Sequence, residues 1–133
     1  LLLEGWCCGS TPINKEYLFH NINRVESLLD KNKKWRQYYN SQLKMNYKKV
    51  FSLFDQQIYI QPPSFNYIIK WRYAQEKNNA LKSRKKDFMN KNDLQVFIQH
   101  YEKLTKWMMK TMPAKADILI KIDGNQKIKK VVT

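Results

Sequence analysis

The 133-residue chain is long enough for one domain with a hydrophobic core, and its 25 Lys and Arg against 11 Asp and Glu give a formal charge of +14. This charge favours phosphate-bearing partners, although the predominance of lysine over arginine also fits the composition of an AT-rich genome. No apolar run approaches the roughly 18 residues that a membrane-spanning helix requires, so we expect no membrane partner. The adjacent Cys7 and Cys8 are spaced neither for a disulfide nor for a zinc site, which favours reduced thiols and the cytoplasm.

The first residues, Leu1–Glu4, predict a buried parallel strand that ends in a carboxylate. Because the chain opens inside a core element, we expect it to be a fragment or the product of a truncated reading frame. After a short helical piece around Val25–Leu29, helical spacing predicts one long amphipathic helix from Trp35 to Asp55. Its predicted core-facing stripe comprises Trp35, Tyr39, Leu43, Tyr47, Val50 and Phe54.

The middle of the chain predicts a short strand and a helix. The strand covers Gln57–Ile60 and is stopped by two prolines. Ser64 is placed to cap the helix that follows, whose apolar face includes Phe65 and Ile68. This helix runs into the basic stretch 82–86, which has no apolar period and which we expect to be a mobile loop.

A second long helix and a final strand are predicted after this loop. Asn92 and Gln95 resemble the capping box of the helix, and Pro113 ends it. Its apolar stripe comprises Leu94, Phe97, Ile98, Tyr101, Leu104 and Met108. Residues 117–122 predict a strand, Gly124 a turn, and 127–133 either a terminal strand or a frayed tail. The alternation of strands and helices predicts an α/β domain with a parallel sheet, whose remaining strands are expected upstream.

Several segments taken together resemble the D-glycerate 3-kinase-like family of P-loop kinases, in order and rough spacing over nearly the whole chain. They are residues 2–7, Trp35-Arg36 with Tyr39-Asn40 and Leu43, Pro62 to Phe65, Trp71-Arg72 with Gln75-Glu76, residues 97–105, and residues 112–117. The resemblance implies the C-terminal part of a three-layer P-loop NTPase fold, related to uridine kinase, phosphoribulokinase and pantothenate kinase. Residues 1–62 would then carry a Walker-B-like strand, the long helix and a core strand, residues 63–112 the helical lid, and residues 113–133 the final strand and tail.

The activity that this resemblance implies is transfer of the γ-phosphoryl group of ATP to a small hydroxylated acceptor such as D-glycerate. Such reactions rely on Mg²⁺ and on positioned cations. Glu4 stands at the position of the family's Walker-B-like carboxylate and is assigned to catalysis and to Mg²⁺. The structural alternative for Glu4 is a strand-end carboxylate that caps nearby backbone amides.

The remaining site residues follow from the same resemblance. Arg72 and Arg84 are assigned to catalysis, and both bind ATP together with Gln75 and Lys86. The alternatives are an Arg72–Glu76 surface pair and, for the stretch 82–86, a solvated run of charge.

Trp6, Arg36 and Asn40 are assigned to the acceptor pocket. For Arg36 and Asn40, four residues apart on the long helix, pairing within the structure is the favoured alternative.

The sequence also departs from the family pattern. Lys103, Lys106 and Lys115 stand where arginine is expected, and lysine lacks the bidentate fork. The motif G-x-x-x-x-G-K-[ST] is absent, and three glycines cannot build its phosphate-binding loop. We therefore expect this chain alone to be inactive and its partner to be a missing N-terminal P-loop half.

Two other interpretations of the sequence stay open. One is a basic nucleic-acid-binding module, which is disfavoured because the aromatic residues keep core spacing and no recognised motif occurs. The other is an inactive remnant of a split gene.

Overall fold

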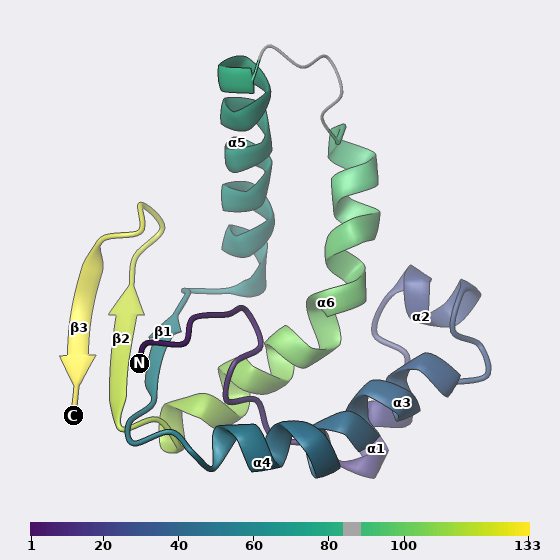
Figure 1. The fold of residues 1–133 in the computed structure, drawn as a ribbon. Helices are drawn as coiled ribbons and strands as arrows, with labels where there is room; N and C mark the ends of the chain where they lie inside the picture. The colour runs from purple at the N-terminus through teal and green to yellow at the C-terminus, as the bar shows by residue number, and fades with distance from the viewer. Residues whose placement is uncertain (84–88) are drawn as a thin grey trace.

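The computed structural model describes residues 1–83 and 89–133, and Figure 1 shows a small sheet beside a group of helices. The α/β class predicted from the sequence is confirmed. The elements, in chain order, are α1 (Lys15–Phe19), α2 (Arg24–Leu28), α3 (Lys34–Gln42), a π-helical turn (Leu43–Tyr47), α4 (Lys48–Phe51), β1 (Ile58–Gln61), α5 (Phe65–Ser83), α6 (Lys91–Thr111), a 3₁₀ turn (Met112–Ala114), β2 (Ile118–Ile122) and β3 (Ile128–Val132).

The sheet of the described residues has the order β1-β2-β3 and is mixed, whereas the sequence predicted a parallel sheet. β1 and β2 are parallel, with Ile58 opposite Ile118, and α5 and α6 form the crossover between them. β3 is antiparallel to β2, because the short turn after Ile122 reverses the chain and leaves no room for a crossover. The Asp123 carboxylate stabilises this turn by accepting hydrogen bonds from the backbone N–H groups of Asn125 and Lys127.

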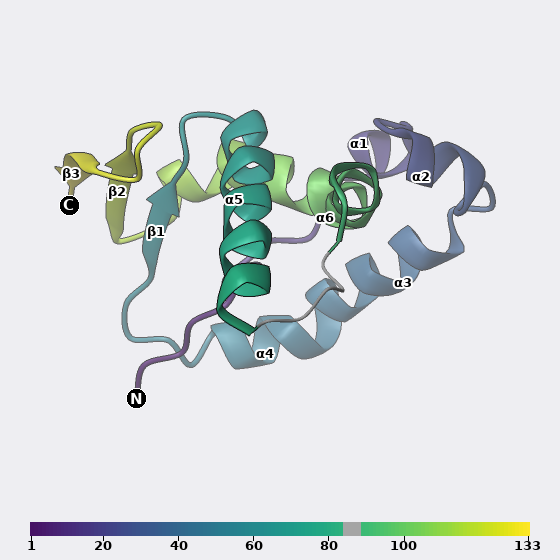
Figure 2. The same ribbon diagram turned by 90° about the horizontal axis from the view of Figure 1, so that it is seen from above.

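The two faces of the sheet differ in their surroundings. Figure 2 shows α5 and α6 on one side of the sheet, and no described helix lies on the other side. Leu119 in the middle of β2 is only 6% exposed, whereas Ile58 and Ile60 on β1 are 55% and 57% exposed. Side chains alternate along a strand, so Ile58 and Ile60 share one face of β1, opposite to that of Tyr59.

Leu1–Glu4 forms no strand, contrary to the expectation of a buried strand. The segment has no regular secondary structure, and Leu1, Leu2 and Leu3 are 127%, 87% and 53% exposed. A strand exists only through hydrogen bonds to a neighbour, and no described strand pairs with this segment.

The long helix predicted from Trp35 is present but buries a different face. Arg36, Asn40 and Leu43 are buried, while Trp35 is 59% exposed. After Leu43 the helix continues through the π-helical turn. Such a turn holds more residues than an α-helical turn, so later residues rotate away from the face that a 3.6-residue period predicts. Tyr47 is accordingly 51% exposed.

The N-cap of the second long helix, α6, lies two residues before the predicted one. Asn90 is the N-cap, and its side-chain oxygen accepts hydrogen bonds from the backbone N–H groups of Asn92 and Asp93. Along its length, α6 packs on α5 through a core cluster that contains Phe65, Leu94 and Ile98. The pair α5 and α6 projects from the sheet as an arm (Figure 1).

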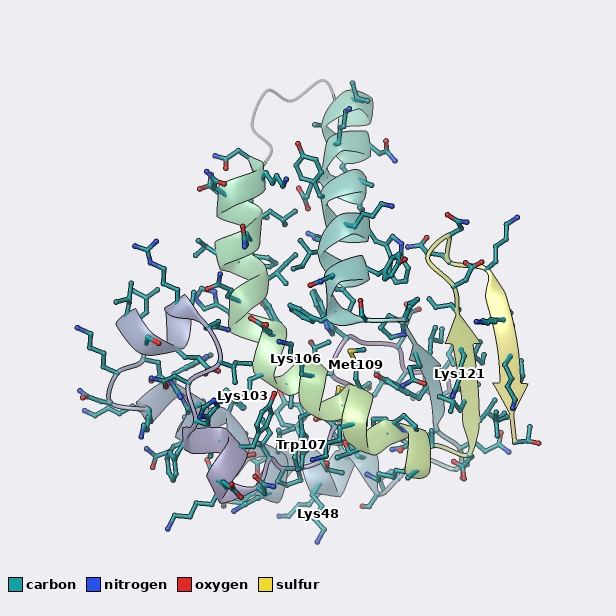
Figure 3. The ribbon with its side chains drawn as sticks, turned by 180° about the vertical axis from the view of Figure 1, so that it is seen from behind. Lys48, Lys103, Lys106, Trp107, Met109 and Lys121 are labelled. Atoms are coloured by element: carbon teal, nitrogen blue, oxygen red, sulfur yellow. The ribbon has the colours of Figure 1, made fainter. Side chains whose placement is uncertain are left out.

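A buried ionic network joins the small N-terminal helices to α6. Arg36 is 1% exposed and contacts the carboxylates of Asp30 at 2.8 Å and Glu26 at 3.6 Å. Lys103 of α6, also 1% exposed, contacts Glu26 at 3.1 Å and donates to the backbone carbonyls of Tyr17 and His20. Figure 3 shows Lys103 on α6 beside these helices. The two cations and two carboxylates balance in charge, which is the condition for burying them.

The network gives a first prediction about stability. Arg36→Met should lower the free energy of unfolding by about 3 to 5 kcal/mol, because Asp30 and Glu26 lose the cation that compensates them. Arg24→Met, on an exposed residue of the neighbouring helix α2, should change it by less than about 0.5 kcal/mol. Urea denaturation followed by circular dichroism measures both. Equal, small effects of the two substitutions would show that the network does not stabilise the fold.

A second prediction concerns pH. Burial alone would raise the pKa of Asp30, but the hydrogen bonds from the Arg36 side chain and from the backbone N–H groups of Trp35 and Arg36 bring that pKa below its usual value. A lowered folded-state pKa adds stability above the unfolded pKa of about 4, and this stability is lost as the pH falls through the folded value. Asp30→Asn should therefore flatten the decline in stability below about pH 4. Asp55→Asn, on an exposed residue, should keep the wild-type decline.

Candidate functional site

A cavity of about 520 Å³ lies at the carboxyl ends of the parallel strands β1 and β2. In open α/β sheets this edge is the usual place of a ligand site. Strands, both long helices and the N-terminal segment contribute to its walls, which are formed by Trp6, Tyr59, Ile60, Pro62, Ile68, Trp71, Thr105, Met108, Ile120, Ile122, Gln126 and Ile128.

One wall of the cavity joins the N-terminal segment to α6. The indole Nε1–H of Trp6 donates a hydrogen bond to the Thr105 hydroxyl at 3.1 Å. The Trp6 ring also stacks on Tyr101, with centroids 5.0 Å apart, and Tyr101 in turn contacts Phe97. These contacts hold residues 99 positions apart in sequence, so the structure gives Trp6 a fixed place at the cavity, where the sequence assigned it to acceptor binding.

The opposite wall joins α5 to the turn between β2 and β3. The indole Nε1–H of Trp71 donates to the backbone carbonyl of Gly124 at 3.0 Å. The ring of Tyr67 lies so close to Gly124 that a Cβ added there would be 2.5 Å from its Cε1 atom. The base of the arm is therefore fixed to the hairpin at a position that only glycine fits.

The cavity is chiefly apolar with a few polar groups. Burial raises the pKa of Tyr59 to about 12, so its phenol stays protonated and able to donate a hydrogen bond at neutral pH. Thr105 and Gln126 add a hydroxyl and an amide to the walls. Apolar walls with a few hydrogen-bonding groups suit a small organic ligand. Within residues 1–83 and 89–133, no cluster of three metal-binding side chains occurs.

Arg72 lies on α5 next to Trp71 and is held by its own helix. Its guanidinium contacts the Glu76 carboxylate at 2.6 Å and donates to the Gln75 side chain at 2.8 Å. Its Nε atom is buried and makes no hydrogen bond to any described group. The pairing with Glu76 is the structural alternative that the sequence left open, and it leaves the Nε donor without a partner among the described groups. Gln75 is exposed.

Arg84 and Lys86, which the sequence analysis assigned to ATP binding in the lid region, lie outside the described residues. Glu4 is exposed and belongs to the segment that leads into Trp6, so it stands near one wall of the cavity but does not line it. The sequence assigned Glu4 to Mg²⁺, and within the described ranges Glu4 belongs to no group of three potential metal ligands.

Arg36 and Asn40 lie outside the cavity, and their surroundings are those of structural residues. Arg36 belongs to the buried ionic network and also donates to the Asn21 side chain and to backbone carbonyls. Asn40 exchanges two hydrogen bonds with the backbone of Ile13, at 2.7 and 3.0 Å. A substrate could reach Arg36 only if these internal contacts were broken, so the structure corrects the assignment of this pair to the acceptor pocket in favour of internal pairing.

The chain resembles known proteins in sequence and in fold. No protein-family model matches the chain. It is 26% identical over 106 residues to a fission yeast (Schizosaccharomyces pombe) protein called "Uncharacterized kinase mug58", a match covering 76% of this chain and 35% of that protein. The sequence relative is a kinase by name. The fold matches the solved structure titled "Structure of YGR205w protein" with a TM-score of 0.60 at 17% identity, covering 96% of this chain and 45% of that one. The chain thus spans about a third to under half of the lengths of these two proteins.

Sequence reasoning missed several residues that build the cavity. Thr105 occupies a buried position of α6 beside Met108, at which an apolar side chain would be ordinary. A hydroxyl at such a position is the signal that could have marked it as the partner of an indole. Tyr59 gave no such signal, because a tyrosine in a short strand is common in any sheet.

The close contact at the hairpin gives a third prediction. Gly124→Ala should lower the free energy of unfolding by about 1 to 3 kcal/mol, because the new methyl group must displace Tyr67 from the base of the arm. Gly5→Ala is the matched control, since a Cβ there would lie 3.8 Å from Cys8, an ordinary contact. Thermal unfolding of the two variants measures the difference. A Gly124→Ala variant as stable as Gly5→Ala would contradict the tight packing of α5 on the hairpin.

Proposed function

We propose that this chain is part of an ATP-dependent small-molecule kinase that transfers the γ-phosphoryl group to a hydroxylated acceptor such as D-glycerate. The observation that carries the proposal is the similarity to a protein named a kinase, together with a fold match over nearly the whole chain. The segments that resemble those of glycerate kinases restrict the proposed acceptor to small molecules such as D-glycerate.

We also place the enzyme in the cytoplasm. No described helix is long and apolar enough to cross a membrane.

The cavity supports a small organic acceptor. It lies at the carboxyl ends of parallel strands, where α/β enzymes bind their ligands. Thr105, Tyr59 and Gln126 can hydrogen-bond hydroxyl groups, and Trp6 closes one side. In this proposal Trp6 binds the acceptor, as the resemblance implies.

The charged residues supply the phosphate chemistry. Phosphoryl transfer depends on cations placed where negative charge develops. Arg72 stands at the base of the arm with one buried donor unpaired among the described groups, and we assign it to the transferred phosphate. Gln75 of α5 would bind ATP together with Arg84 and Lys86, which the resemblance assigns to the lid. All four remain proposals that rest on the resemblance.

Glu4 is the candidate for the magnesium ion. Mg²⁺ in kinases is commonly held by one or two carboxylates together with substrate phosphates and water, so a single exposed carboxylate fits that mode. The bound ion would neutralise charge on the phosphates. The phosphate-binding loop itself would come from an N-terminal P-loop half, for which this chain has no glycine-rich substitute.

A kinase assay tests the proposal and is the fourth prediction. The full reading frame containing this chain should phosphorylate D-glycerate with ATP and Mg²⁺, whereas the 133 residues alone should be inactive. In the full protein, Arg72→Met should lower kcat by about 10³-fold, the scale of an arginine that stabilises a transferring phosphoryl group. Glu4→Gln should weaken activity and raise the Mg²⁺ requirement.

The controls are matched in charge. Arg24→Met and Glu16→Gln change exposed residues away from the cavity and should leave kcat within about twofold. Turnover of ATP by the 133-residue chain alone would contradict the need for a P-loop half. Full activity of Arg72→Met would remove Arg72 from the catalytic role.

A further inference from the structure

We infer that a second pocket, between α1 and α3, binds a small organic anion, namely a carboxylate or a phosphate ester with a short hydrocarbon body. The pocket has a volume of about 290 Å³ and shares no wall residue with the cavity described above. The inference is independent of the proposed function, because none of the residues that line this pocket takes part in the proposed phosphoryl transfer.

The floor of this pocket is apolar and buried. Ile13 and Leu18 are only 2% and 5% exposed, and the half-buried ring of Phe19 completes this side. Asn40 of α3 also lines the pocket, but its Oδ1 and Nδ2 atoms already bond to the backbone of Ile13. A hydrocarbon chain can therefore be buried against this floor without depriving a polar group of its partner.

The exposed wall residues of the pocket include two lysines. Lys15 belongs to α1 and Lys44 to the π-helical turn after α3, and neither forms an ion pair with any residue in 1–83 or 89–133. No carboxylate lines the pocket. Lys33 adds a third positive charge nearby, with its Nζ atom 5.2 Å from the centroid of the Phe19 ring. Ammonium groups from two elements at one pocket, without a countercharge, favour an anion there.

The hydrogen-bond donors left for a ligand are those that an anion needs. The Ser41 hydroxyl already donates to the backbone carbonyl of Tyr38 at 2.7 Å. The side chain of Gln37, exposed at the same pocket, has no hydrogen-bond partner among the described groups. Its amide and the ammonium groups of Lys15 and Lys44 can donate to carboxylate or phosphate oxygens. Hydrogen bonds between charged groups are the stronger kind, so these lysines would supply most of the preference for an anion.

The chemistry of the walls restricts the class of ligand. The walls of the 520 Å³ cavity contain no charged side chain, whereas those of this pocket contain two cations. A metal cation would be repelled by these lysines, and a neutral ligand would leave them without a countercharge. The volume is close to the lower limit for small-molecule sites, so the ligand is small. An anionic head on a chain of about six carbons meets these conditions.

A ligand in this pocket would also stabilise the small helices. The backbone carbonyl of Leu18 accepts hydrogen bonds from Arg36 at 3.5 Å and from Lys103 at 3.4 Å, so the floor of the pocket is joined to the buried ionic network. A hydrocarbon body packed on Leu18 would add apolar contact between α1 and α3. Because a ligand that binds only the folded state raises its stability, binding should also raise Tm.

An NMR titration of the ¹⁵N-labelled chain provides the test, which is the fifth prediction. Hexanoate or hexyl phosphate should bind with a Kd on the order of 1 mM, the scale for a ligand of this size. 1-Hexanol and inorganic phosphate should each bind at least about tenfold more weakly, because each offers only the chain or only the charge. The double substitution Lys15→Gln with Lys44→Gln should weaken binding at least about tenfold. Lys48→Gln with Lys49→Gln is the matched control, because these exposed lysines of α4 line neither pocket (Lys48 is labelled in Figure 3), and it should keep Kd within about twofold.

The same spectra locate the site. Saturable shifts confined to the amides of residues 13–19 and 37–44 support the inference, and the tighter of the two probes identifies the head group as carboxylate or phosphate. Absence of saturable binding by both probes, or shifts centred on Tyr59 and Thr105 of the other cavity, overturns it. Equal affinity of the two double variants for the probe also overturns it. Circular dichroism shows whether each variant folds, and the shifts of the unsubstituted chain decide the location by themselves.

Discussion

The arrangement of the helices depends on the buried network of Arg36, Glu26, Asp30 and Lys103. The helices α1 to α3 are short and bury few apolar side chains, chiefly Leu18 and Val25. Hydrophobic burial alone gives such short helices little to pack with. The network supplies the missing connection, because every charge has an opposite partner and the cations also hydrogen-bond to backbone carbonyls. It tolerates no single deletion, since a charge left alone inside the fold costs more than the pair contributes.

Helix α6 carries this connection to the rest of the molecule. Lys103 binds the small helices, Thr105 and Met108 line the cavity, and Leu94 and Ile98 pack on α5. Successive residues of a helix differ in direction by about 100°, so one helix can serve three neighbours at once. Trp107, one turn beyond Lys103, extends the contact with the N-terminal region by donating to the Thr11 hydroxyl (Figure 3). The position of Thr105 at the cavity therefore depends on the ionic contacts that Lys103 makes two residues earlier in the helix.

The sequence predicted what periodicity and turn chemistry control, and missed what depends on distant contacts. The two long helices, β1, β2 and the turn at Gly124 follow from local patterns. The burial of Arg36 does not, because a charged residue on a helix is ordinarily exposed and its partners lie 6 to 18 residues away. The π-helical turn rotated the predicted stripe, and Leu1–Glu4 has apolar content without a paired strand. In the candidate site, Trp6 was found from the resemblance, while Thr105 and Tyr59 required the cavity itself.

Three features of the structure lie close together. The cavity opens at the carboxyl ends of β1 and β2, β1 is an edge strand of the described sheet, and the exposed leucines precede Glu4 and Trp6 in one segment. Phosphoryl transfer needs a site from which water is excluded, because stray water competes with the acceptor hydroxyl and weakens the cationic contacts. A polypeptide that covers the edge of β1 would also enclose the cavity. The proposed phosphoryl transfer would gain from such a cover, because water would then be excluded from the cavity.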